Sequence, residues 1–481
     1  MTGGQRGVRD RRYEWLVLLT VMTGSFMSTM DSSIANLSLP VLSQVFQEGP
    51  AVVLWVSLVY ILTLSGLMLT AGRMGDLLGR KRIYASGFAI FSLGLVLCSL
   101  AQNMPQLILF RVVQAAGGAL TTGLGPALIT TTFPPEERGR ALGIWGMSIG
   151  AGLGSGPALG GVLLDTLGWR SIFWARLPLS VAGAVVAWTM LRESRPVTSQ
   201  PRFDIWGALF LFGGVASLLV GVNQGQVRGW TSPFILALGA TSLVLLTSFL
   251  VVERRTPQPV VDLALFRSRP FATATVTQFF YYASYVGVSF LMPFYLIRGR
   301  DLPPLTSGLL LTIMAAAMGL LSPLAGRLCD RIGHRVLVAA GIGLSILGLL
   351  LLRGLGPSAT PLEIGLDLLV LGVGAGFFMT PNYSAIMGSV PADRLGTASA
   401  MISTPRALGQ AAGLALIGVV LVWRELHYTV GLAQEGWQGE ALASRALIGG
   451  FADALWVSIL AGFLGLGVTL LGEGGRPAGR R

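Results

Sequence analysis

The sequence consists largely of apolar stretches separated by short polar segments. A helix needs about 20 predominantly apolar residues to cross a bilayer, and fourteen stretches have a suitable length. Charged residues make up 12% of the chain, about half of the roughly 25% that is usual in a soluble domain. The sequence therefore predicts an all-α integral membrane protein. The expected spans run over 15–40, 51–71, 83–101, 106–131, 141–164, 171–191, 204–222, 233–252, 271–296, 306–326, 336–353, 362–387, 396–422 and 449–471.

The first apolar stretch follows several arginines, as the core of a signal peptide does. It runs from Trp15 to Pro40 and contains Asp31. That is longer than the apolar region of about 7–15 residues in a signal peptide. We therefore expect it to be the first membrane helix.

The basic residues predict the orientation of the chain in the membrane. With the N-terminus in the cytoplasm, the cytoplasmic segments hold 24 of the 34 basic residues and the outer segments hold 8. The other two, Arg111 and Arg406, lie inside expected helices. This distribution follows the positive-inside rule and predicts cytoplasmic N- and C-termini in a bacterial plasma membrane. Because the charge is scattered, the net charge of +12 does not predict a nucleic-acid partner.

Two segments of the chain repeat one pattern. Gly72–Lys81 and Gly326–Arg335 both contain G-R-x-x-D-x-x-G followed by basic residues, 254 positions apart. The same offset carries the start of the first span to about residue 269, close to the start of the ninth. We therefore expect two six-helix bundles with two helices inserted between them. The expected units are a cytoplasmic N-terminus (1–14), an N-terminal bundle (15–191), a linker with two extra helices (192–270), a C-terminal bundle (271–471) and a cytoplasmic C-terminus (472–481).

The first repeated segment resembles the signature between helices 2 and 3 of the major facilitator superfamily. Gly75 stands where alanine is usual in that signature, and Leu77 where arginine is common. The resemblance implies the major facilitator fold and a cytoplasmic latch that forms ion pairs in one transporter state. The alternative is a solvated loop that only fixes the topology. The latch residues would be Gly72, Asp76, Gly79, Arg80, Lys81 and Asp330.

The first helix carries an acid inside the membrane. Asp31 shares a helix face with Thr20, Gly24, Ser28 and Ala35. That face must point into the bundle, because a carboxylate in lipid costs several kcal/mol. The segment from Met30 to Pro40 is similar to the helix-1 signature of the fourteen-helix drug/proton antiporter family.

Arg111 is a second charge inside a helix. The segment Arg111–Ala119 resembles the family's helix-4 signature, with Ala115 where glycine is usual. At about 1.5 Å per residue, Asp31 lies roughly 14 Å below Pro40 and Arg111 roughly 9 Å below Pro105, so the two side chains can meet. We expect Asp31 and Arg111 to couple transport to protons. A purely structural ion pair is the alternative.

The fifth expected helix is rich in glycine. One face carries Gly150, Gly154, Pro157 and Gly161, and another carries Gly152, Gly156 and Gly160. Small residues allow helices to approach closely, although glycine zippers also occur in membrane proteins that transport nothing. The segment Gly154–Gly161 resembles the antiporter signature of family exporters. The resemblance implies a gating role for Gly150, Gly154, Gly156, Pro157, Gly160 and Gly161.

The substrate site is less well marked. Gln114, Asp367, Tyr282 and Phe378 are candidates for a central cavity, although aromatic residues more often serve packing. Arg176 stands where relatives commonly have asparagine, and we expect it to add a charge at the outer face.

The expected function is export of lipophilic or cationic small molecules, such as drugs, in exchange for protons by alternating access. A specific metabolite, lipid or siderophore is an alternative cargo, and a non-transporting receptor is a further alternative. The single lysine, Lys81, is followed by Arg82, so the chain lacks the P-loop of an ATP-driven pump. We expect no enzyme activity, no cofactor and no metal site, since two Cys and two His are widely scattered. The expected partners are the lipid bilayer, protons and the small-molecule substrate, with the protein acting as a monomer.

Overall fold

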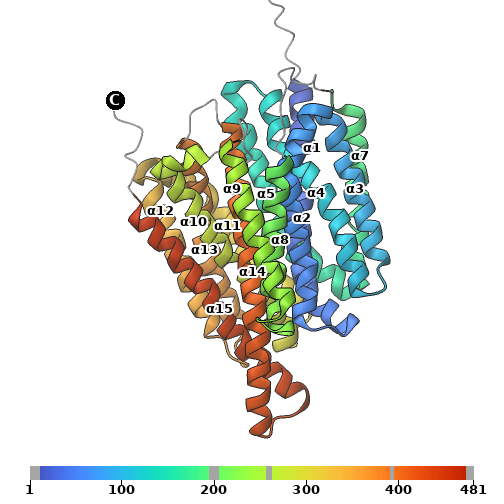
Figure 1. The fold of residues 1–481 in the computed structure, drawn as a ribbon, viewed down its shortest axis with the longest axis vertical. Helices are drawn as coiled ribbons and strands as arrows, with labels where there is room; N and C mark the ends of the chain where they lie inside the picture. The colour runs from blue at the N-terminus through green and yellow to red at the C-terminus, as the bar shows by residue number, and fades with distance from the viewer. Residues whose placement is uncertain (1–10, 194–204, 256–262, 390–394, 473–481) are drawn as a thin grey trace, which may run out of the picture.

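The computed structural model describes residues 11–193, 205–255, 263–389 and 395–472, with a few side chains inside helices left undescribed. The described part is helical throughout (Figure 1). The helices are α1 (Arg11–Phe46), α2 (Pro50–Leu78), α3 (Arg80–Leu100), α4 (Met104–Thr132), α5 (Pro135–Leu167), α6 (Ser171–Trp174), α7 (Leu177–Met190), α8 (Ile205–Arg228), α9 (Pro233–Arg255), η1 (Leu263–Arg267), α10 (Arg269–Phe294), η2 (Tyr295–Gly299), α11 (Pro304–Ile332), α12 (His334–Arg353), α13 (Pro361–Gly388), α14 (Leu395–Gln434) and α15 (Gly439–Leu471).

Each expected span coincides with a helix, the sixth being formed by α6 and α7 together. Within the described residues, twelve helical segments are long and apolar enough to cross a membrane. The two expected spans outside this set are α1, which carries charges in its first turn, and α8, whose apolar part is Leu209–Leu218. The all-helical membrane fold is thus confirmed, and the structure supports twelve to fourteen spans.

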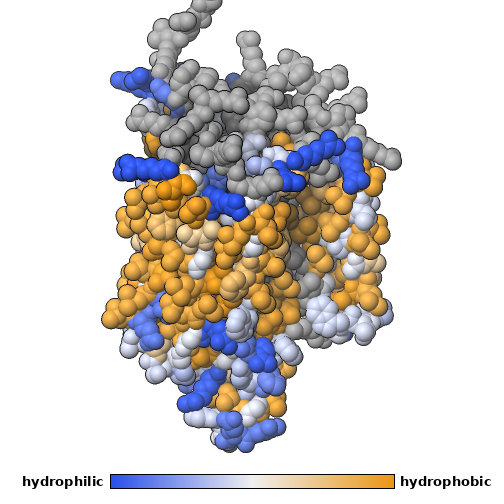
Figure 2. Space-filling model, turned by 90° about the vertical axis from the view of Figure 1, so that its left-hand side faces the viewer, coloured by the Kyte–Doolittle hydropathy of each residue, from blue (hydrophilic) through white to orange (hydrophobic). Residues whose placement is uncertain are grey.

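The surface has the polarity that a membrane requires. Apolar side chains form a continuous belt around the middle of the face shown in Figure 2, and hydrophilic residues lie above and below it. The start of α1 and the end of α15 lie on the same side of this belt (Figure 1). We refer to this side as the terminal side.

The repeated sequence pattern corresponds to a repeated turn. Gly79 ends α2 with φ 98°, and Gly333 ends α11 with φ 85°. These φ values lie in the left-handed region that side chains with a Cβ atom rarely adopt. The chain therefore reverses directly into α3 and α12, and the last glycine of each G-R-x-x-D-x-x-G copy has this backbone role.

A close helix packing recurs in the two halves of the chain, α1–α7 and α10–α15, which we call the first and the second bundle. In the first, Gly152 of α5 lies against the carbonyl of Phe26 of α1, where an added Cβ would be only 2.6 Å from that oxygen. In the second, Gly409 of α14 lies against the carbonyl of Phe279 of α10, with a corresponding distance of 2.2 Å. Helices α8 and α9 pack on each other, and α8 also contacts α2 and α14.

One expected loop is helical. The segment between the expected spans 396–422 and 449–471 is largely helical, because α14 continues to Gln434 and α15 begins at Gly439. This helical hairpin projects beyond the belt (Figure 1). Its base is held by Arg424, which forms an ion pair of 2.5 Å with Asp453, and Tyr428 donates to the same carboxylate at 3.1 Å. These polar contacts satisfy the charges without ending the helices.

Candidate functional site

Asp31 lies at the centre of a buried charge network. Arg111 Nη1 donates to Asp31 Oδ2 at 2.6 Å, and Gln114 Nε2 donates to Asp31 Oδ1 at 2.8 Å. Arg111 also donates to Gln114 Oε1 at 2.8 Å. The Asp31 and Arg111 side chains have no solvent exposure. The structure therefore brings together the carboxylate of Asp31 and the guanidinium of Arg111, which the sequence analysis singled out in two separate helices.

A third charged residue completes the network. Arg176 Nη1 also donates to Asp31 Oδ1, and its side chain is 3% exposed. Sequence reasoning placed Arg176 as an extra charge at the outer face, and this placement was wrong. The short α6 ends at Trp174, and Arg176 stands immediately before α7 with its Nε donating to the Ile172 carbonyl at 2.5 Å. The side chain therefore points into the bundle.

Aromatic and backbone groups support Arg111 from the side of α2. The Arg111 guanidinium lies 4.2 Å from the centre of the Tyr60 ring, and its Nε donates to the Val56 carbonyl at 3.2 Å. The Tyr60 hydroxyl is 3.3 Å from Ser28 Oγ. A cation over an aromatic face is stabilised most when both are desolvated, as they are here.

The network carries an excess of positive charge. One carboxylate faces two guanidinium groups, and the Nη2 atoms of Arg111 and Arg176 have no hydrogen-bond partner among the described residues. Unbalanced charge inside a membrane protein is costly. Protonation of Asp31 would leave both guanidinium groups without a counter-ion, so the arrangement is sensitive to that single proton.

A cavity lies beside this network, between the two bundles. It is lined mainly by hydroxyl and apolar side chains of α1, α2, α4 and α5, and α14 closes it from the second bundle. Ser28 lines it and also contacts Tyr60, so a chain of contacts leads from the cavity through Ser28 and Tyr60 to Arg111. The lining residues are Ser25, Ser28, Thr29, Ser32, Ile61, Leu64, Met68, Thr122, Ile149, Arg406, Ala407 and Gln410.

The two glycine faces of α5 have different partners. Gly156 packs on α1 of its own bundle, where an added Cβ would be 1.8 Å from Ser33 Oγ. Gly161 packs on α11 of the other bundle, where an added Cβ would be 2.6 Å from the Pro304 carbonyl oxygen. Gly154 also faces α11, at 3.5 Å from the Ala315 Cβ. Glycine on α5 thus serves both folding within a bundle and contact between bundles.

The contact between α5 and α11 opens toward the terminal side. Moving in that direction, the antiparallel pairs are Gly161 with Pro304 and Gly154 with Ala315, and the next pair would be Gly150 with Gly319. An added Cβ at either Gly150 or Gly319 would meet nothing within 4 Å. On this helix pair the closest contacts therefore lie on the far side, and the pair loosens toward the terminal side.

The comparison with protein families agrees with this architecture. The model of the Major Facilitator Superfamily matches residues 21–414. The chain belongs to the major facilitator superfamily. It is a multi-pass membrane transporter and not an enzyme.

Several relatives within the superfamily carry names that describe transport or resistance. The riboflavin transporter RibZ of Clostridioides difficile is 33% identical over 84% of this chain and 87% of its own length. The multidrug resistance protein Stp of Mycobacterium tuberculosis is 35% identical over 85% of this chain and 76% of its own length. The tetracenomycin C resistance and export protein of Streptomyces glaucescens is 28% identical over 87% of this chain and 77% of its own length.

A solved structure shows the same superfamily fold. The chain matches a bacterial homologue of the human lysosomal transporter Spinster, in an inward-facing and unoccupied conformation, with a TM-score of 0.70. The match covers 97% of this chain and 98% of that chain, at 17% identity. At this identity the likeness concerns the fold.

The four predicted cavity residues are not gathered at one site. Gln114 is occupied by the charge network, and Tyr282 lies behind Arg406, whose guanidinium is 5.9 Å from its ring centre. Phe378 is fully buried and stacks on Tyr281 with ring centres 3.6 Å apart, so it packs α13 against α10. Asp367 is a partly exposed residue of α13 and does not line the central cavity.

The predicted latch is only partly visible. Arg80 Nη1 donates to Thr131 Oγ1 at 3.0 Å, which ties the start of α3 to the end of α4. Lys81 is half-buried in the first turn of α3. The side chains of Asp76 and Asp330, and the surroundings of Gly72, lie outside the described part, so the ion pairs expected of a latch stay a prediction.

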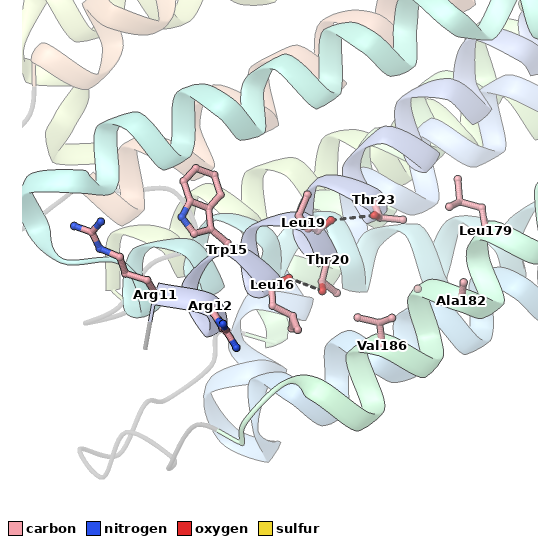
Figure 3. A pocket seen from close by; sticks show the side chains of 11 residues that line it. Arg11, Arg12, Trp15, Leu16, Leu19, Thr20, Thr23, Leu179, Ala182 and Val186 are labelled. Atoms are coloured by element: carbon pink, nitrogen blue, oxygen red, sulfur yellow. Dashed lines mark hydrogen bonds between the residues drawn. The ribbon is translucent and has the colours of Figure 1, made fainter. Parts of the chain in front are cut away.

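A larger cavity lies away from the charge network, on the side of the first bundle (Figure 3). It has a volume of about 610 Å³ and runs between α1 and α7, with Trp15, Leu19 and Leu179 among its lining residues. These three side chains are at least 40% exposed, as apolar residues are where they face lipid. It involves one bundle only, so it does not have the position of an alternating-access site.

Proposed function

We propose that this transporter exports lipophilic small molecules in exchange for protons, by alternating access between its two bundles. The observation that carries the proposal is the buried carboxylate of Asp31, held by two guanidinium groups next to a cavity between the bundles. Intramembrane ionisable residues mark proton relays and substrate pathways. Names of several relatives, among them multidrug resistance proteins and an antibiotic export protein, support an exporter.

In this proposal the terminal side is cytoplasmic, and α1 and α8 also cross the membrane, which gives fourteen spans. The structure then corresponds to a state that is open to the cytoplasm, with Asp31 ionised and paired. In the opposite state Asp31 takes up a proton from outside, and its contacts with Arg111 and Arg176 are released. Return to the inward-open state delivers the proton to the cytoplasm, because the guanidinium groups again favour the carboxylate.

A buried carboxylate such as that of Asp31 is the usual partner of a cationic cargo. The carboxylate has no exposed surface, and it is already occupied by two cations and by the amide of Gln114. A cation therefore has no free partner there in this state. We infer that Asp31 acts as a proton site that is separate from the cargo.

A specific metabolite is the second candidate cargo, since the riboflavin transporter is similar over most of both chains. Inverted membrane vesicles with an imposed pH gradient test both cargoes, with fluorescein as a drug-like probe and riboflavin as the metabolite probe. Accumulation of either probe that collapses with the gradient supports proton-coupled export, and the probe that accumulates decides between drugs and the metabolite. The proposed coupling is wrong if neither probe accumulates in response to the gradient. It is also wrong if the accumulation persists in Asp31→Asn.

A further inference from the structure

Arg406 is the one charged residue among the described residues that line the central cavity. It lies on α14, so it is contributed by the second bundle to a cavity whose other walls belong mainly to the first. The cavity is lined by no acid, and no carboxylate of the described residues forms an ion pair with Arg406. A guanidinium group inside a membrane protein without a counter-ion is costly, and a ligand can supply the missing charge.

Two tyrosine side chains hold Arg406 in place. The hydroxyls of Tyr282 and Tyr383 lie beside its guanidinium group and are 2.6 Å from each other. Both are neutral groups, so they orient the cation without neutralising it. The Tyr282 ring, 5.9 Å from the guanidinium carbon, covers Arg406 on the side of α10.

The first bundle contributes further hydrogen-bond donors to the lining of this cavity. The Ser25 hydroxyl accepts a bond from Trp145 Nε1 at 2.7 Å, which leaves its own proton free to donate. The hydroxyl of Thr122 is buried and has no partner within the described part of the chain. A buried hydroxyl without a partner is costly, and an acceptor atom of a ligand would satisfy it.

The size of the cavity defines what fits. Its volume is about 60 Å³, whereas a pocket for a whole drug-sized ligand has roughly 300–1,000 Å³. A water-sized group needs roughly 10–15 Å³, so the cavity holds one small polar group. The remainder of a larger cargo would extend toward the terminal side, where the pair α5 and α11 loosens.

We propose that Arg406 binds an anionic oxygen group of the cargo, such as a carboxylate, together with the hydroxyls of Ser25 and Thr122. This inference rests on the proposed export function and names its cargo class: acidic small molecules with an apolar body. Arg406 would bind cargo while Asp31 binds the proton, and the two sites communicate through Ser28 and Tyr60. Cargo and proton would thus occupy different residues of one cavity region.

The test compares binding of fluorescein and fluorescein methyl ester to the purified full-length protein in lipid nanodiscs, at a mildly acidic pH at which the phenol of both dyes is protonated and the carboxylate of fluorescein is ionised. The two dyes differ in one carboxylate. The wild type is expected to prefer fluorescein, and Arg406→Gln is expected to lower fluorescein affinity by about 10- to 100-fold, the range for a hydrogen bond to a charged group. The affinity for the ester should change little in Arg406→Gln. The fluorescein affinity of Arg406→Lys should lie between those of the wild type and Arg406→Gln.

Thermal melting of each variant shows whether it is folded, and Arg424→Gln serves as a control arginine outside the cavity. Lack of preference for fluorescein in the wild type, including no binding of either dye, would overturn the inference. So would a preference that persists in folded Arg406→Gln. Binding that depends on Arg406 without gradient-driven transport would leave the inference standing and would contradict the proposed function instead.

Discussion

Arg176 donates a hydrogen bond to the carboxylate of Asp31 from the start of α7, opposite the bond that Arg111 donates from α4. A carboxylate with two such partners is a counter-ion for both. The stability of the first bundle therefore depends on the charge of Asp31, and the same charge is the one that a proton would remove.

The first prediction concerns Asp31→Asn. This variant leaves two buried guanidinium groups without a counter-ion, and breaking a buried ion pair in this way costs about 3–5 kcal/mol. We expect a lower melting temperature in detergent and no transport driven by a pH gradient. The double variant Asp31→Asn/Arg176→Asn removes one of the two cations and should recover most of the melting temperature without recovering transport. Gradient-driven transport by the single variant would assign the coupling to another acid.

The second prediction separates the two arginines. Arg176→Asn leaves Asp31 paired with Arg111 and reduces the local charge from +1 to zero, so we expect a melting temperature no lower than that of the wild type. Arg111→Asn removes contacts to Val56 and Gln114 as well as the ring contact with Tyr60, so it should be clearly less stable. Melting curves of both variants test this difference. If the melting temperature falls equally in both variants, Arg111 does not have the central role.

The third prediction uses the two faces of α5. Gly161→Ala would place a Cβ 2.6 Å from the Pro304 carbonyl, so α5 and α11 must separate on the side away from the termini. We expect the equilibrium to shift toward the opposite state. A cysteine at Leu305, in a Cys98→Ser/Cys329→Ser background, should then react faster with a membrane-impermeant maleimide added from outside.

Two further variants on α5 serve as controls for this shift. Gly146→Ala meets nothing within 4 Å and should leave the labelling rate unchanged. Gly156→Ala would clash with Ser33 inside the first bundle and should lower expression or melting temperature instead. If Gly161→Ala labels at the wild-type rate, the contact between the bundles does not control this opening.

The sequence was sufficient to predict the positions of the helices and the contact between Asp31 and Arg111. Membrane spans are set by local apolar length, and the depths of the two residues follow from counting along each helix. Arg176 could not be placed in this way, because its direction depends on the break between α6 and α7 rather than on its distance from a span end. A clue was present, since an arginine replaces the asparagine that is common in relatives. Phe378 could not be assigned from the sequence, because packing and cavity lining have the same composition, and in the structure it stacks on Tyr281.

The final prediction concerns the number of spans. If α8 and α9 both cross the membrane, the turn that joins them is external and the end of α9 is cytoplasmic. In the background without Cys98 and Cys329, an impermeant maleimide applied to intact cells should label Thr231→Cys but not Arg254→Cys. Glu435→Cys, in the turn between α14 and α15, should also be labelled and serves as the external reference. Labelling of Thr231→Cys only after permeabilisation would place that turn inside. The pair α8 and α9, of which α8 lies beside α2 and α14, would then not complete fourteen spans.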